Sequence, residues 1–335
     1  MSANGPICAA IVGLGRWGQN LMAAATNNPD HPLRFVQGVT RTPSKAAQFT
    51  KHHGIPVSDD YDAMLENPAI QAVVLATPHS QHCDQICKAA NAGKHVFVEK
   101  PLALTFDEAR RAIDTCNNQG VTLAVGFNRR FLPAFQELYD AQTAGTLGAP
   151  LHIDANFSGP FGYQYNADMW RGSVSENPAG GMAAMGIHML DAMIHLLGPV
   201  ENVSTLSRQL AIEAPLDDTT NVQLLFQCGA TGSLTTLMAT NSIWRLQLFG
   251  SAGWGAMKDQ HNLELALIDK EPRVIDYDAN DTLAAELAAF ADCAHGHGTF
   301  PVTHQEALAG VAAMEAISRS AASNGDRVSV TTVTP

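Results

Sequence analysis

The stretch ICAAIVGLGRWG, residues 7–18, decides the fold of the first part of the chain. Its opening apolar run predicts a buried strand, and three glycines in GxGxxG spacing follow at once. Such a turn between a strand and a helix lets backbone N–H groups approach a pyrophosphate. We therefore expect a dinucleotide cofactor at Gly13, Leu14, Gly15, Arg16, Trp17 and Gly18.

The second strand, 33–39, ends about 20 residues beyond the glycine turn, where such folds contact the adenosine ribose. An acid there would select NAD, but the sequence has Thr40 and Arg41, followed by Lys45. Cations suit the 2′-phosphate of NADP, so the sequence favours NADP(H). The alternative is NAD(H), with Arg41 and Lys45 as solvated loop residues.

Apolar strands and helical segments continue to alternate up to residue 126. The expected strands lie at 72–76, 96–98 and 121–125, and the expected helices at 60–66, 80–92 and 106–117. Repeated units of this length predict the α/β fold class with a parallel, doubly wound Rossmann sheet.

The segment HVFVEKPLAL, residues 95–104, places Lys100 at the end of a buried strand. Pro101 has no N–H for a sheet hydrogen bond, so the strand must stop before it. Ligands bind at this end of open α/β sheets, which makes Lys100 a candidate acid–base residue. The alternative is a lysine that ends a strand in solvent. Further cofactor contacts are expected at Thr40, Arg41, Lys45, Thr77, Pro78, His79, His82, Glu99 and Lys100.

After Gly126 the pattern changes to consecutive strands, which predicts an α+β domain with a large, mostly antiparallel open sheet. The expected strands are 151–157, 200–209, 219–227, 231–239, 243–249 and 261–268, and the expected closing helices are 281–294 and 304–323. We place the dinucleotide-binding domain at 1–126 and the substrate-binding and oligomerisation domain at 127–335.

The segment AGGMAAMGIHMLDAMIHLLG, residues 179–198, predicts a helix that is buried on nearly all sides. At 3.6 residues per turn, His188, Asp191 and His195 fall on one stripe. A buried polar group without a partner costs about 1 to 3 kcal/mol. These residues therefore form either a satisfied core network or part of a binding site.

Five motifs together resemble the Gfo/Idh/MocA oxidoreductases, named for glucose-fructose oxidoreductase and inositol dehydrogenase. They are GxGxxG at Gly13–Gly18, TP at Thr77–Pro78, EKP at Glu99–Pro101, WR at Trp170–Arg171 and GGM…GIHMLD at Gly180–Asp191. The resemblance implies a Rossmann domain, a second domain with an open sheet, and an active site between them. It also implies hydride transfer between nicotinamide and a sugar, polyol or related cyclic alcohol, with Lys100 and His188 at the reacting oxygen.

The sequence departs from the family at one position. Many relatives carry an Asp four residues before the helix histidine, where this chain has Ala184. On a helical interpretation Ala184 shares the stripe of His188, so the missing carboxylate would have faced the same cleft. Lys100 and His188 remain as the proton-handling pair, with Asp191 as a candidate orienting partner of His188. The identity of the general base stays open.

Substrate contacts are expected in the segment FSGPFGYQYNADMWRG, residues 157–172, and at Asn128. Its aromatic rings offer apolar faces and its polar side chains can bond hydroxyls, a combination that suits a monosaccharide-like ring. The alternative is an ordinary surface loop with a buried Trp. The expected contacts are Lys100, Asn128, Tyr163, Trp170, Arg171, His188 and Asp191.

Two other functions stay open. The first is dehydrogenation of an aromatic dihydrodiol or of a cyclic hemiacetal whose carboxylate Arg129, Arg130 or Arg171 could clamp. The second is a non-catalytic nucleotide-binding sensor, which is compatible with Ala184 but has no physical need for two proton-transfer groups.

Composition narrows the class of protein. The 335 residues are 46% hydrophobic with a formal net charge of −12, which fits a two-domain globular enzyme and opposes nucleic-acid binding. No charge-free apolar run reaches the roughly 18 residues of a membrane span, and no signal-peptide pattern starts the chain, so we expect a cytoplasmic protein. The six cysteines lack CxxC spacing and are expected to be reduced core residues without a metal.

The strand sequences TGSLTTLMAT and WRLQLFG carry apolar side chains at positions of both parities. Such strands are expected to be covered on both faces, by helices on one and by another subunit on the other. We therefore expect a homodimer or homotetramer.

Overall fold

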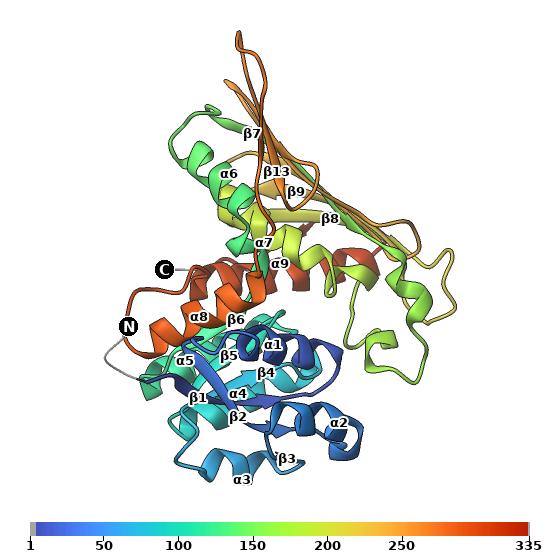
Figure 1. The fold of residues 1–335 in the computed structure, drawn as a ribbon. Coiled ribbons are helices and arrows are strands. Elements are labelled where there is room, and N and C mark those ends of the chain that lie inside the picture. The colour runs from blue at the N-terminus through green and yellow to red at the C-terminus, as the bar shows by residue number, and fades with distance from the viewer. Residues whose placement is uncertain (1–4, 334–335) are drawn as a thin grey trace. The chain divides into compact units, whose positions relative to one another are not determined.

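The computed structural model describes residues 5–333, which form two compact units (Figure 1). The first unit holds the described residues up to Ala103, Asp107–Asn128 and Asp281–Thr303; the second holds Leu104–Phe106, Arg129–Asn280 and the described residues from His304 onward. A single boundary after residue 126 does not describe this division. The segment 281–303, expected in the second domain, belongs to the first unit.

The first unit contains a six-stranded sheet in the order β3-β2-β1-β4-β5-β6, with every pair of neighbours parallel. Its strands are β1 (Ile7–Val12), β2 (Leu33–Val39), β3 (Val57–Ser58), β4 (Ala72–Leu75), β5 (His95–Glu99) and β6 (Leu123–Gly126). The order reverses between β1 and β4, the point at which open α/β sheets bind ligands. The doubly wound fold predicted from the sequence is thus confirmed.

Helices connect these strands and cover the sheet. They are α1 (Arg16–Thr26), α2 (Pro43–His53), α3 (Tyr61–Glu66), α4 (His82–Asn91) and α5 (Phe106–Gln119). A further helix, α8 (Thr282–Ala294), buries Leu287, Phe290 and Ala291 in the same core as β1 and β2. This apolar contact is the physical reason why the segment from residue 281 belongs to the first unit.

The second unit contains a nine-stranded sheet in the order β14-β13-β12-β11-β7-β10-β9-β8-β15. Its strands are β7 (Pro150–Ser158), β8 (Val200–Arg208), β9 (Thr219–Phe226), β10 (Thr231–Leu237), β11 (Ile243–Gly250), β12 (Gly253–Met257), β13 (Asn262–Leu267), β14 (Arg273–Asp276) and β15 (Val328–Ser329). Only the β7–β10 pair is parallel among the strands of residues 5–333 that form this sheet. The mostly antiparallel sheet is confirmed, although β12, β14 and β15 were not predicted.

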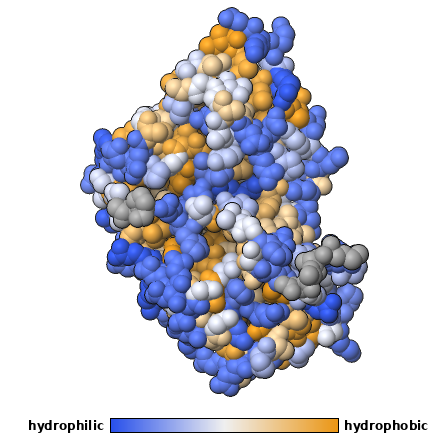
Figure 2. Space-filling model, turned by 90° about the vertical axis from the view of Figure 1, so that its left-hand side faces the viewer, coloured by the Kyte–Doolittle hydropathy of each residue, from blue (hydrophilic) through white to orange (hydrophobic). Residues whose placement is uncertain are grey.

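Three helices of the second unit, α6 (Pro133–Thr143), α7 (Gly186–Leu197) and α9 (His304–Ala322), pack against one face of this sheet (Figure 1). In β10 the burial alternates, so Leu234 points to the helices while Ser233 and Thr235 point the other way. Figure 2 shows hydrophilic residues over most of one side of the molecule, with hydrophobic groups between them. Within residues 5–333 no helix combines the length and hydropathy that crossing a bilayer requires.

Helix α7 is shorter than the helix predicted for residues 179–198. It begins at Gly186, and Gly180–Met182 form a separate 3₁₀ turn, because adjacent glycines disfavour an α-helix. Ala184 lies before the helix, so the expectation that it shares a helical stripe with His188 is wrong.

Candidate functional site

The glycine turn after β1 has two glycines that the fold itself requires. Gly13 has φ +92°, and a Cβ there would lie 2.5 Å from the carbonyl oxygen of Ala76. A Cβ on Gly18 would lie 2.0 Å from the carbonyl oxygen of Gly13. Both glycines therefore permit the close approach of α1, β1 and β4.

Gly15 differs from its two neighbours in the motif. It precedes α1 with φ −72° and ψ −176°, an extended conformation that any residue adopts, and a Cβ there would meet no atom within 4 Å. The fold leaves open space at this position, at the N-terminus of a helix without an acidic residue in its first turn. Unpaired helical N–H groups beside open space fit a pyrophosphate, so the residues present suit a dinucleotide.

The end of β2 carries the residues expected at the adenosine ribose. Thr40 follows the strand and donates its backbone N–H to Ser58, while Arg41 and Lys45 are exposed. Neither cation joins the ion pairs found among residues 5–333. Lys45 lies in the first turn of α2 and not in a loop, because Pro43 suits the first helical position.

His82 holds two loops of the first unit together. It is fully buried, with Nδ1 2.7 Å from the carbonyl oxygen of Pro101 and Nε2 3.1 Å from that of Thr77. Both ring nitrogens lie beside the backbone that follows β4 and β5, which gives His82 a structural role, and its cofactor contact stays a prediction. For the neighbouring His79, also buried, the cofactor contact stays a prediction.

Lys100 lies at the carboxyl edge of the parallel sheet. The strand β5 ends at Glu99, as the position of Pro101 predicted, and the Lys100–Pro101 peptide bond is cis. Glu99 is buried, and a Cβ on the adjacent Gly126 would lie 3.2 Å from its Oε1 atom. The geometry places Lys100 at the end of the sheet where ligands bind.

In the second unit, His188 lies in the first turn of α7 and is only 6% exposed. Its ring centroid is 6.1 Å from that of Phe157, at the end of β7. The guanidinium carbon of Arg129 lies 6.0 Å from the same Phe157 ring. Phe157 therefore lies near both the candidate acid–base histidine and a cation, an arrangement that strand alternation in the sequence could not identify.

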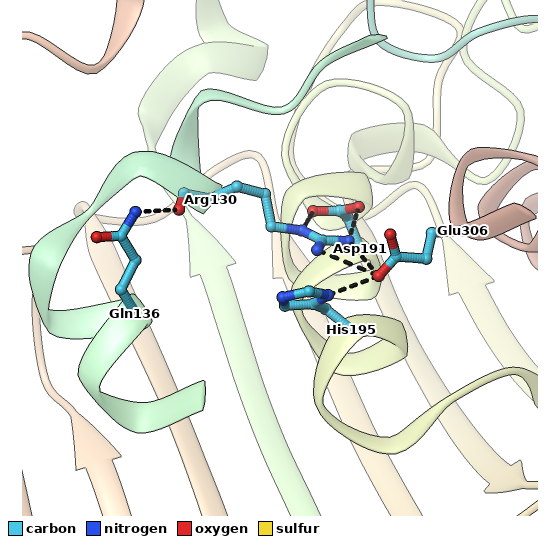
Figure 3. A network of polar contacts seen from close by, with 5 residues as sticks. All are labelled: Arg130, Gln136, Asp191, His195 and Glu306. Atoms are coloured by element: carbon cyan, nitrogen blue, oxygen red, sulfur yellow. Dashed lines mark hydrogen bonds and ion pairs between the residues drawn. The ribbon is translucent and has the colours of Figure 1, made fainter. Parts of the chain in front are cut away.

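A buried network of charged groups joins α7 to α9 and to the segment before α6 (Figure 3). Arg130 donates Nε–H and Nη2–H to the two carboxylate oxygens of Asp191, at 2.6 and 2.8 Å. It also lies 3.3 Å from Oε1 of Glu306, which is 2.5 Å from Nδ1 of His195. The His195 ring stacks on Tyr139 of α6 with centroids 4.0 Å apart.

This network gives two of the expected residues partners within the chain. Both oxygens of Asp191 accept hydrogen bonds from Arg130, so Asp191 is a structural partner of Arg130, and its predicted roles as orienting group of His188 and as substrate contact stay predictions. The guanidinium of Arg130 is engaged by Asp191 and Glu306, and its role as a carboxylate clamp also stays a prediction. Complete burial raises the pKa of Asp191 while Arg130 opposes that change. Burial lowers the pKa of Arg130, but the carboxylates of Asp191 and Glu306 raise it by a larger amount, so the net change is upward.

The candidate substrate contacts in the segment 157–172 and at Asn128 differ in their exposure and in their partners. Tyr163 is 63% exposed and donates its hydroxyl to the carbonyl oxygen of Ala239 at 3.3 Å. The guanidinium carbon of Arg171 lies 4.2 Å from the ring centroid of Trp170. Asn128 belongs to the first unit, is buried, and donates its Nδ2–H to Thr282. Its role as a substrate contact stays a prediction.

Within residues 5–333 no group of three or more His, Cys, Asp or Glu side chains is placed to hold a metal ion. All six cysteines are free thiols, and burial raises the pKa of Cys83 to about 11.

Comparisons with known proteins agree with this geometry. Residues 7–127 match the model of the oxidoreductase family with an NAD-binding Rossmann fold, and residues 135–255 match the GFO/IDH/MocA C-terminal domain. The chain belongs to the GFO/IDH/MocA family. It is therefore an NAD(P)-binding oxidoreductase, as the five sequence motifs predicted.

Several GFO/IDH/MocA proteins are similar to this chain. The scyllo-inositol 2-dehydrogenase (NAD(+)) of Bacillus subtilis (strain 168) is 39% identical over 148 residues, which cover 43% of this chain and 42% of that protein. The trans-1,2-dihydrobenzene-1,2-diol dehydrogenase of Bos taurus is 27% identical over 234 residues, covering 69% and 68%. The structure of aldose-aldose oxidoreductase from Caulobacter crescentus complexed with glycerol has a TM-score of 0.86 at 24% identity, covering 97% and 100%; that likeness shows the fold.

Proposed function

We propose that this protein is a dehydrogenase or reductase that transfers hydride between a nicotinamide dinucleotide and a hydroxyl-bearing carbon of a sugar, polyol or related cyclic alcohol. The observation that carries the proposal is the open space at Gly15 beside the α1 N-terminus, combined with Lys100 at the ligand-binding edge of the same sheet. The similarity to scyllo-inositol 2-dehydrogenase (NAD(+)) supports the substrate class.

NADP(H) is the favoured cofactor, with NAD(H) as the alternative. Val39 ends β2 without a following acid, and the exposed Arg41 and Lys45 offer two cations to a 2′-phosphate. A charge-assisted hydrogen bond contributes about 1.5 to 3 kcal/mol, enough to select between the two dinucleotides.

Lys100 and His188 handle the proton in this proposal. A nicotinamide dinucleotide held at the glycine turn would supply or accept the hydride, and the oxygen on the substrate carbon that gains or loses this hydride must gain or lose a proton. A proton donor or acceptor must come within about 2.6 to 3.2 Å of that oxygen. Each unit offers one such group, Lys100 after β5 and His188 on α7, and Ala184 provides no carboxylate to share the work.

A second substrate class follows from the similarity to trans-1,2-dihydrobenzene-1,2-diol dehydrogenase. For a substrate that carries a carboxylate, Arg129 beside Phe157 and Arg171 on Trp170 stay candidate clamps, while Arg130 bonds Asp191 and Glu306. A nucleotide-binding sensor without turnover is the third alternative.

Reduction of NAD⁺ and NADP⁺, measured across sugars, inositols and dihydrodiols, separates these functions. We expect turnover with a sugar or polyol, and tighter binding of NADP⁺ than of NAD⁺. Lys100→Met should lower kcat about 100-fold or more, and His188→Asn by less, while cofactor affinity stays nearly unchanged. Lys88→Met, which removes an exposed lysine paired with Asp62, is the matched control. Normal turnover of Lys100→Met would refute the mechanism, and loss of its cofactor binding would make the lysine structural.

A further inference from the structure

The loop between β8 and β9 is built around one buried carboxylate, Asp218, which is 1% exposed. Its Oδ2 atom accepts three backbone N–H bonds, and its Oδ1 atom accepts the hydroxyl of Thr219 at 2.8 Å. The three donors are Leu210 at 2.9 Å, Ala211 at 2.6 Å and Ile212 at 3.0 Å.

These bonds favour the ionised carboxylate. Burial by itself raises the pKa of Asp218. The hydrogen bonds from the three backbone N–H groups and from Thr219 together lower this pKa by a larger amount, so the net shift is downward. An asparagine keeps one acceptor oxygen but carries no charge, and its amide N–H₂ group would replace the other oxygen, so either the backbone N–H groups or the Thr219 hydroxyl would lose its present acceptor. The order of the loop therefore depends on a charged acceptor at residue 218.

The loop that Asp218 holds carries a small apolar cluster of its own. Ile212, Ala214 and Leu216 are buried together, and Tyr165 and Ala239 pack against them. Tyr165 lies within the segment 157–172, which carries the candidate substrate contacts. The loop after β8 is thus a support for that segment, although the two are far apart in sequence.

Backbone hydrogen bonds reinforce this support. The N–H of Met238 donates to the carbonyl oxygen of Asp218 at 2.8 Å, and the N–H of Gly162 donates to the carbonyl oxygen of Met238 at 2.8 Å. A Cβ on Gly162 would lie 2.9 Å from both Ile212 and the carbonyl oxygen of Met238, so the segment lies directly on the loop and on the end of β10. A displaced loop would displace the segment with it.

We propose that Asp218 is a positioning residue for substrate recognition: it orders the loop 209–217, and the ordered loop holds the segment 157–172 in the conformation that binds substrate. The proposal rests on the proposed function, in which that segment contacts the substrate. Asp218 itself does not touch substrate or cofactor.

The test uses Asp218→Asn in the full chain, with Glu213→Gln as the matched control. Glu213 is an exposed carboxylate on the same loop, so the control removes the same charge without removing the buried acceptor. We expect Asp218→Asn to expose the amides of Leu210, Ala211 and Ile212 to hydrogen exchange. It should also raise KM for the substrate about tenfold or more, with kcat changed less and cofactor affinity unchanged.

A second variant, Leu216→Ala, removes part of the apolar cluster but keeps Asp218, and it should raise KM in the same way. If Asp218→Asn does not fold, this variant decides the matter alone. An unchanged KM in the folded variants, alongside faster amide exchange, overturns the proposal and leaves the proposed function intact. Absence of turnover in the unmodified protein with every substrate overturns both.

Discussion

Gly13, Gly15 and Gly18 share one motif but meet different physical requirements. Gly13 and Gly18 have neighbouring backbone where a Cβ would be, whereas Gly15 has open space and an unstrained extended backbone. The fold would accept a methyl group at residue 15, and a dinucleotide phosphate that approaches the helix would not.

This difference predicts opposite outcomes for two small substitutions. Gly15→Ala should leave the thermal unfolding temperature nearly unchanged and weaken dinucleotide binding about tenfold or more, because the methyl group occupies the ligand's space. Gly18→Ala should lower the free energy of unfolding by about 1 to 3 kcal/mol, because its Cβ meets the carbonyl of Gly13. Calorimetry and cofactor titration measure both. Equal cofactor affinity in Gly15→Ala and the unmodified protein would contradict this assignment.

At the scale of single elements, the Arg130 network links helices of the second unit that lie far apart in the sequence. Arg130 precedes α6, Asp191 and His195 lie on α7, and Glu306 begins α9, so one group of charges connects three helices (Figure 3). His188 lies one turn before Asp191 on α7. The network therefore holds in place the helix that carries the candidate histidine.

Arg130→Met should destabilise the protein by about 3 to 5 kcal/mol, because it leaves the buried charge of Asp191 without its partner. The double variant Arg130→Met/Asp191→Leu should recover much of that loss, since removing both charges also removes their desolvation penalty. Lys88→Met breaks an exposed pair with Asp62 and should hardly move the unfolding temperature. Urea unfolding followed by circular dichroism measures all three. A double variant no more stable than Arg130→Met would contradict this explanation, because the loss would then not come from the unpaired charge of Asp191.

At the scale of the whole molecule, the nine-stranded sheet has a second face, opposite the one covered by α6, α7 and α9. The side chains on that face are mixed. Polar residues bond across strands, His152 to Thr231 at 2.7 Å and Asn221 to Thr235 at 2.9 Å. Leu237 of β10 and Phe249 of β11 are half-buried apolar residues on the same face, as the apolar positions of both parities predicted. A face that combines polar and half-buried apolar side chains is suited to contact a second copy.

We expect a dimer or larger assembly at micromolar concentration by light scattering. Thr235→Arg should shift the mass toward the monomer, because an arginine at a covered position would lose water without gaining a partner. Ser44→Arg, an added charge on the exposed side of α2, should leave the mass unchanged. A monomeric mass for the unmodified protein would refute the assembly.

The sequence predicted the alternating elements of the first unit, because their cues are local. The apolar run before Gly13 predicts β1, and Pro101 alone ends β5. The lysine at the end of β5 could be identified for the same reason, since a strand end in a parallel sheet fixes which edge its next residue lies on. The predicted start of α7 was wrong. The apolar pattern continues back through Gly180–Met182, but the backbone there forms a 3₁₀ turn, and the α-helix begins only at Gly186.

Only the tertiary structure decided the partners of buried polar groups. Helical spacing placed His188, Asp191 and His195 on one stripe, but Arg130 and Glu306 come from segments that no periodicity relates to that helix. Likewise α8 follows the second sheet in sequence and packs on the first, because its apolar side chains fill a core made by β1 and β2. Periodicity reports which side chains avoid water, and the physical identity of their partners depends on contacts between distant parts of the chain.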